Sequence, residues 1–174
     1  MLHGQAASDL IVRCEAKMTS RILTRERILE IIKCYDHLPE PENREMTILK
    51  GHLLIETRLK GYIARELPNP DGYNLDRFRF SQLTEIAQGL CASRHQDNLW
   101  QSIQKLNTLR NRLSHELDDI RLSSALEDFL DFHTKHFFKG DSEHRNVHSC
   151  VVSLYSSLVH LVAEDTEQAS SADG

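Results

Sequence analysis

The chain has 174 residues, a length typical of one domain with a substantial buried core. Hydrophobic residues make up 40% and charged residues 27%, and only 7 Gly and 4 Pro interrupt the chain, which favours long helices over many short strands. A net charge of -5 excludes a protein that coats nucleic acid through a dense basic face, although a local basic cleft is still compatible with it.

The first part of the chain predicts helices separated by proline-containing breaks. Residues 1–8 are expected to fray, and apolar positions from Asp9 to about Tyr35 keep a helical period, as one long helix or as two with a break near Thr24. Two prolines in the run PEPEN, residues 39–43, end this segment. A second helix is expected over 44–66, with its buried face formed by Ile48, His52, Ile55, Leu59, Tyr62 and Ile63.

Glu56 lies beside the buried face of this second helix. It is either a boundary carboxylate bonded to an arginine, which we favour, or a group that orients side chains on a neighbouring helix. Residues 68–72, PNPDG, then form the strongest loop signal in the chain. A short helix follows, with Ser81 as a possible cap and with its apolar face formed by Leu83, Ile86, Ala87 and Leu90.

A longer helix is expected over 102–117, preceded by Asp97 as a plausible N-cap. Its apolar stripe recurs at gaps of three and four, at Leu99, Ile103, Leu106, Leu109, Leu113 and Leu117. The same helix carries the sequence RNRLSH, residues 110–115. Asn111 and His115 are four residues apart and lie on one side, and the long side chain of Arg110 can reach round toward them.

These residue types suit RNA cleavage without a metal ion. That reaction needs a group that takes the 2′-hydroxyl proton, a group that protonates the leaving 5′-oxygen, and positive charge beside the phosphorus. His115 can act as acid or base near neutral pH, Arg110 presents a fork that matches two phosphate oxygens, and Asn111 can fix the geometry. Arg112 and Lys105 would add RNA-binding charge. The alternative is that Arg110 and His115 only cap and pair along a helix surface.

The motif with its flanking helices resembles the HEPN superfamily of small all-helical domains, many of them ribonucleases. Residues 51–67, GHLLIETRLKGYIAREL, are similar to the earlier helix of that family with its buried acid, and residues 78–90, FRFSQLTEIAQGL, resemble the short helix of the mannitol-repressor-like branch. The resemblance implies an up-and-down bundle of five or six helices. It also implies a homodimer in which two motifs, each with Arg110, Asn111 and His115, face one RNA-binding cleft.

The resemblance leaves several functions open. The first is an endoribonuclease of a toxin, phage-defence or RNA-processing system, with RNA as its partner and an antitoxin or regulatory protein as a candidate second partner. The second is a non-catalytic regulatory or protein-binding module of the same fold, and a third is a purely structural bundle in a larger assembly. Some family toxins carry a Tyr two residues after the motif His, where this chain has Leu117, so an antitoxin that modifies that Tyr is not expected. Direct DNA binding has the least support, since no helix-turn-helix with a basic face occurs.

After the motif, Asp118 and Asp119 are expected to close the helix, and a capping box of Ser124 and Glu127 to start the next one. Gly140 should stop that helix, and Asp141 or Ser142 should start the last. The buried face of the last helix is predicted to consist of Val147, Cys150, Val151, Leu154, Leu158 and Leu161. Residues 164–174 are acidic and rich in small side chains, so we expect one domain over 1–163 and a disordered tail.

The remaining polar residues predict no cofactor and no metal. His133, His136, His144 and His148 are spaced at three and four, but no acid or Cys completes a zinc site, so they are interpreted as surface histidines. Cysteines at 14, 34, 91 and 150 form no CxxC pair and indicate reduced, mostly buried thiols. Neither a secretory signal nor a membrane span is recognised, which predicts a cytoplasmic protein.

Overall fold

The structure is a computed structural model that describes residues 24–91, 96–115 and 119–172, without the side chains of 71, 115, 119 and 162–172. Within these residues all regular structure is helical and no strand is present, which confirms the all-α prediction. The α-helices are α2 (Arg25–His37), α3 (Arg44–Glu66), α4 (Phe80–Leu90), α5 (Asp97–His115), α6 (Asp119–Phe137) and α7 (Val147–Ala172). Short 3-10 helices are η1 (Pro70–Gly72), η2 (Leu75–Arg77) and η3 (Ser142–His144).

The first two described helices begin at polar caps. The side chain of Thr24 accepts a hydrogen bond from the backbone N–H of Arg27, so α2 begins at the position where the sequence suggests a break. The helix expected before it, from Asp9, lies outside the described residues. Asn43 caps α3 in the same way, with its Oδ1 atom 3.2 Å from the backbone nitrogen of Met46. The bounds of α3 and all six residues predicted for its buried face are confirmed.

Three predicted helix starts are wrong. Helix α4 begins after Arg79, whose backbone N–H donates to the side chain of Gln82, and not at Ser81. Helix α6 begins at Asp119, so Ser124 lies inside it instead of capping it.

The last helix starts at Val147, later than expected. Asp141 caps only η3, whereas Asn146 accepts from the backbone N–H of Ser149 at the start of α7. At α4 and α7 a neighbouring residue, Arg79 or Asn146, therefore stands at the helix start in place of the predicted one.

Gly140 does end α6, as predicted. It has a φ of 83°, and its N–H donates to the carbonyl of Thr134, which closes the last turn. At the other end of the chain, helix α7 runs on to Ala172. The backbone over 164–172 is therefore helical, where the sequence predicts a disordered tail. The predicted residues 102–117 of the motif helix lie within α5 as far as His115, and Leu117 and Asp118 lie outside the described residues.

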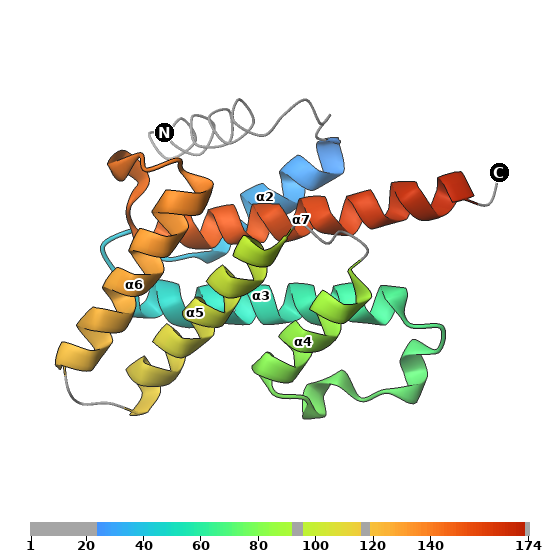
Figure 1. Cartoon of the computed structure of the whole chain (residues 1–174), viewed down its shortest axis with the longest axis horizontal. Helices are drawn as coiled ribbons and strands as arrows, with labels where there is room; N and C mark the ends of the chain where they lie inside the picture. Colours follow the sequence, from blue (N-terminus) through green and yellow to red (C-terminus); the bar gives the residue numbers. More distant parts are fainter. Residues whose placement is uncertain (1–23, 92–95, 116–118, 173–174) are drawn as a thin grey trace.

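Helices α3 and α7 lie side by side through the middle of the molecule, and α2 packs on α7 (Figure 1). Helices α5 and α6 form a pair that crosses them obliquely, and α4 packs on α3 and α5 (Figure 1). The core is formed where α3, α5 and α7 meet, with the fully buried side chains Ile55, Leu59, Leu106, Leu109, Leu154 and Leu158 among its members. All six residues predicted for the buried face of α7 are buried.

None of the helices, over the residues that the structure describes, is long and apolar enough to cross a membrane. Cys34 and Cys150 are buried free thiols and Cys91 is half-buried, as expected for three of the four cysteines; Cys14 lies outside the described residues. Burial raises the pKa of Cys34 to about 12, so this thiol is not a nucleophile near neutral pH.

Candidate functional site on helix α5

The candidate site lies on the second half of α5. The predicted apolar stripe is confirmed for Leu99, Ile103, Leu106 and Leu109, which are buried, while Leu113 is half-buried and Leu117 lies outside the described residues. Helix α5 crosses α3 near Asn107, and its last turns extend beyond α3 (Figure 1). The motif residues, 110–115, therefore lie beyond the crossing point, on the part of α5 that extends away from the core.

Arg110 and Asn111 lie at the surface of this protruding end. Arg110 is half-buried and Asn111 is exposed, and the Nη1 atom of Arg110 donates to Oδ1 of Asn111 over 3.3 Å. Among the described residues, no carboxylate forms an ion pair with Arg110. Its guanidinium thus retains donors that can bind a phosphate group.

His115 is the last residue of α5. Its backbone belongs to the helix, and its side chain lies outside the described part of the structure. On an ideal helix it is turned by about 40° from Asn111, so the two residues share one side of α5. The predicted proximity of Asn111 and His115 thus follows from the helix alone.

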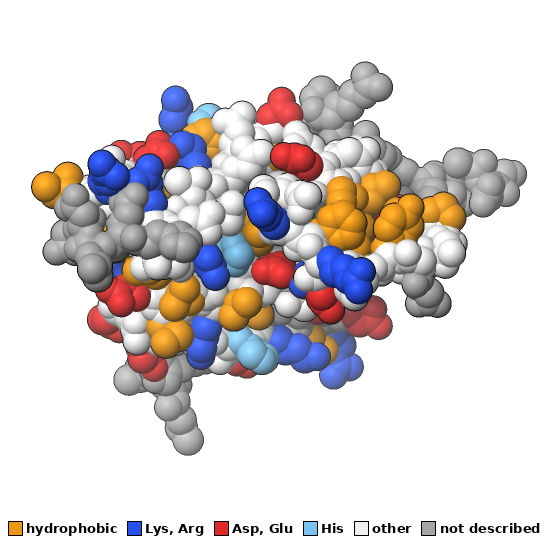
Figure 2. All heavy atoms as spheres, turned by 90° about the horizontal axis from the view of Figure 1, so that it is seen from below, with side chains coloured by type: hydrophobic (Ala, Val, Ile, Leu, Met, Phe, Trp, Pro, Cys, Tyr) orange, Lys and Arg blue, Asp and Glu red, His pale blue; other side chains and the backbone are white. Residues whose placement is uncertain are grey.

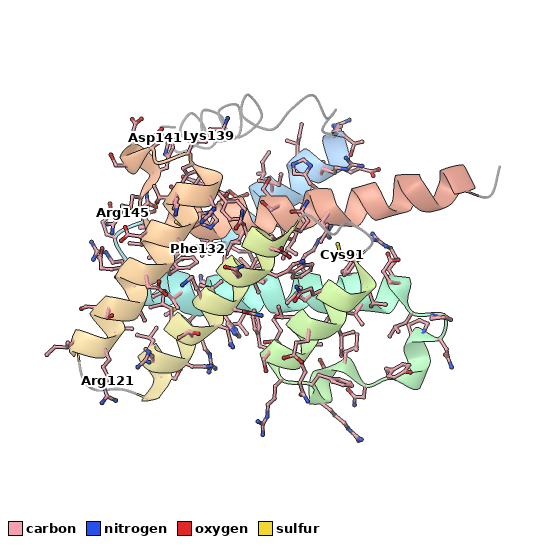
Figure 3. All side chains as sticks on the ribbon, viewed as in Figure 1. Cys91, Arg121, Phe132, Lys139, Asp141 and Arg145 are labelled. Carbon is pink, nitrogen blue, oxygen red and sulfur yellow. The ribbon has the colours of Figure 1, made fainter. Side chains whose placement is uncertain are left out.

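The two residues predicted to add RNA-binding charge have different surroundings. Lys105 faces α6, where its Nζ atom is 2.6 Å from Oδ2 of Asp128 and 5.1 Å from the ring centre of Phe132. Phe132 lies on the side of α6 that faces α5 (Figure 3). Arg112 is half-buried, further along α5. The charge of Lys105 is therefore engaged in the α5–α6 contact.

The structure adds a histidine from α3 to the site. His52 is only 6% exposed, and its Nε2 atom is 3.1 Å from Oδ1 of Asn107. Its ring stacks on that of Phe80, the first residue of α4, with the ring centres 4.0 Å apart. Three helices thus hold this imidazole in one place.

The surroundings of His52 favour its neutral form. Burial lowers its pKa, the hydrogen bond with Asn107 partly opposes this effect, and the charge of Arg110 lowers the pKa further. The sequence predicts His52 only as a member of the apolar face of α3. The pattern that could have indicated its polar contacts is a histidine on that face followed by Glu56 one turn later.

Glu56 is paired with a lysine, which corrects the predicted arginine partner. Its Oε1 atom is 2.8 Å from Nζ of Lys60, which also contacts Asp76 of η2 at 3.0 Å. The Oε2 atom of Glu56 lies 4.0 Å from Nδ1 of His52, too far for a hydrogen bond. Glu56 therefore adds negative charge beside His52 without fixing its ring.

A further arginine lies near the end of α5. Arg121, at the start of α6, is found beside the lower end of the α5–α6 pair (Figure 3). Figure 2, which views this end from below, shows several Lys and Arg side chains gathered at its left edge with acidic side chains beside them. On the rest of that face Lys and Arg side chains are interspersed with Asp and Glu side chains and with apolar side chains, so no continuous basic surface is seen there.

The other histidines do not form a metal site together. His133 and His148 are buried, at 0% and 5% exposure, which corrects their interpretation as surface residues. His133 pairs with Ser102 and stacks on Phe137, while His148 contacts Tyr35. Among the described residues, one cluster could hold a cation, formed by Asp141, Glu143 and His144 at the opposite end of α6 from the candidate site.

Comparisons with family models, with curated proteins and with solved structures find no match to this chain.

Proposed function

We propose that the chain is a metal-independent endoribonuclease of the HEPN type, with a toxin, phage-defence or RNA-processing role. The observation that carries the proposal is the position of Arg110. It is half-buried near His52, has no carboxylate partner among the described residues, and lies one helical turn before the end of α5, where His115 is located. The resemblance of residues 110–115 to the family motif supports the same assignment.

In the proposed reaction the 2′-oxygen of a ribose attacks the adjacent phosphorus while a base takes the 2′-hydroxyl proton. The bond from phosphorus to the 5′-oxygen breaks, and an acid delivers a proton to that oxygen. The products are a 2′,3′-cyclic phosphate and a free 5′-hydroxyl. His115 takes one of the two proton-transfer roles, Arg110 stabilises charge on the non-bridging oxygens, and Asn111 orients the group that it contacts.

A second protomer completes this site. Two proton transfers need two groups, and His52 is buried and held by Asn107, so it cannot reach a substrate. A homodimer that joins two α5 ends supplies two copies of His115. Arg112 and Arg121 then add positive charge on both sides of the cleft, which compensates locally for the acidic chain.

The test is cleavage of transfer RNA and messenger RNA in EDTA by the wild type and by variants. We expect His115→Ala to lower the rate about 10²- to 10⁴-fold, as for loss of a general acid or base. We expect Arg110→Ala to lower it about 10²- to 10³-fold, with partial recovery in Arg110→Lys. Product ends should carry a cyclic phosphate.

His136→Ala is the matched control, because His136 is exposed on α6 and contacts Phe132. Its cleavage rate should equal that of the wild type. The dimer is tested in the same samples by light scattering. Cleavage that survives in His115→Ala would exclude this mechanism.

One observation favours the alternative, a non-catalytic regulatory or protein-binding module of the same fold. Leu53 is 61% exposed and Met46 42% exposed, with half-buried Leu49 between them, on α3, the helix that carries His52. On a helix these three residues form one apolar stripe, which suits a protein contact. Intact RNA with every folded variant would favour the module.

A further inference from the structure

The bond between His52 and Asn107 determines which way the Asn107 amide points. The Oδ1 atom of Asn107 can only accept, so the Nε2 atom of His52 must carry the proton that it donates over 3.1 Å. Stacking on Phe80 prevents the imidazole from turning away. The carbonyl end of the amide is therefore fixed toward α3.

The amide NH2 group of Asn107 consequently points away from His52. Among the described residues, the side chain of Asn107 bonds to His52 only, so the two N–H donors of this half-buried group have no protein acceptor there. Arg110 follows Asn107 by three residues and Asn111 by four, which places all three on one side of α5.

We propose that Asn107 is a substrate-binding residue of the α5 site, whose amide N–H groups bind an RNA phosphate together with Arg110, and that His52 is the positioning residue that orients this amide. This inference rests on the proposed function, because it takes the substrate to be RNA. It adds two residues outside the motif to the site. The neutral imidazole of His52 orients the Asn107 amide but adds no charge to the site.

The arrangement suits an anion such as a phosphate and does not suit a cation. The Asn107 NH2 group and the Arg110 guanidinium are all donors, so they bind an anion with several acceptor oxygens. Glu56 lies on the far side of His52, where Lys60 neutralises its charge. The negative charge of Glu56 is thus already paired with Lys60 and does not repel an RNA phosphate bound by Asn107 and Arg110.

The test measures binding of a short single-stranded RNA whose 2′-hydroxyl groups are methylated, so that cleavage cannot occur. We expect Asn107→Ala to weaken binding about tenfold, as for loss of a hydrogen bond to a charged group. Asn107→Asp should weaken it more than Asn107→Ala, because a carboxylate keeps the bond to His52 but repels the phosphate. If Asn107 only supports the fold, Asn107→Asp should weaken RNA binding less than Asn107→Ala does, because the carboxylate keeps the bond to His52.

The second pair of variants tests the role of His52. His52→Gln keeps an N–H donor near the position of Nε2 and should bind RNA within about threefold of the wild type. His52→Leu removes the donor and should weaken binding as Asn107→Ala does, with no further loss in the double variant. Asn98→Ala removes an exposed amide at the far end of α5 and is the control.

The outcomes separate this inference from the proposed function. Equal RNA binding by the wild type, Asn107→Ala and Asn107→Asp, with cleavage of unmodified RNA retained, overturns the role of Asn107 and leaves the endoribonuclease intact. A wild type that neither binds nor cleaves RNA overturns both. Circular dichroism of each variant shows whether the helical fold is preserved.

Discussion

At the scale of single residues, the contact between α5 and α6 contains a buried polar pair. Ser102 and His133 are both fully buried, and the Oγ atom of Ser102 is 2.8 Å from Nδ1 of His133. The other ring nitrogen of His133 and the hydroxyl of Thr134 have no partner among the described residues. In an apolar interior the hydrogen bond between Ser102 and His133 stabilises the folded state, and the unpaired hydroxyl of Thr134 destabilises it.

We predict effects of different size for two substitutions in this contact. Ser102→Ala leaves the imidazole without a hydrogen bond and should lower the free energy of unfolding by about 1–3 kcal/mol. Thr134→Val removes a hydroxyl that has no partner and should change that energy by less than about 1 kcal/mol. Urea unfolding of both variants checks the prediction. Equal destabilisation by the two would show that the hydroxyl of Thr134 is paired after all.

At the scale of the helices, the close approach of α3 and α7 depends on one glycine. A Cβ atom at Gly51 would lie 2.7 Å from a methyl carbon of Val151, closer than carbon atoms normally approach. The β-branched side chain of Val151 is stiff and buried, so it cannot turn aside without cost. Gly61 on the same helix has open space around its Cα atom.

These two glycines form a matched pair of tests. Gly51→Ala should lower the melting temperature, because overpacking costs about 1–3 kcal/mol and outweighs the gain in helix propensity. Gly61→Ala should raise it, through a gain of about 0.5–1 kcal/mol in an exposed helix. Adding Val151→Ala to Gly51→Ala relieves the overlap, so the two substitutions should be strongly non-additive.

At the scale of the whole molecule, buried histidines link stability to pH. Burial lowers the pKa of His133 to about 3, and burial also lowers the pKa values of His52 and His148. In the unfolded chain these groups take up protons near pH 6.5. The unfolded state therefore binds more protons than the folded state in mildly acidic solution, and stability must fall as pH falls below about 6.5.

We predict that His133 accounts for a measurable share of the dependence of the free energy of unfolding on pH. Between about pH 6 and pH 4, the free energy of unfolding should fall by up to about 1.4 kcal/mol per pH unit from this group alone. His133→Gln should lose that part of the slope, whereas the exposed His136 replaced by Gln should keep it. Urea unfolding at several pH values measures both slopes, and identical slopes for wild type and His133→Gln would contradict the assignment.

The local pattern of residues was sufficient for the helices and their buried faces. The periodic apolar positions on α3, α5 and α7 and the loops at prolines and Gly140 were predicted correctly, because they depend on residues within a few turns. The starts of α4, α6 and α7 were not, because several neighbouring polar residues can each cap a helix. That Asn111 and His115 share one side of α5 is likewise a property of one helix, and the tertiary structure adds the hydrogen bond from Arg110 to Asn111.

Contacts between helices were decided only by the tertiary structure. No pattern of residues pairs His52 with Asn107, 55 positions away, or places Phe80 against that ring. Nor could the sequence show that Lys105 is engaged with Asp128 on α6 while Arg110 has no carboxylate partner among the described residues. Helical periodicity shows which side chains share a face, but the face that each one meets depends on how the helices pack together.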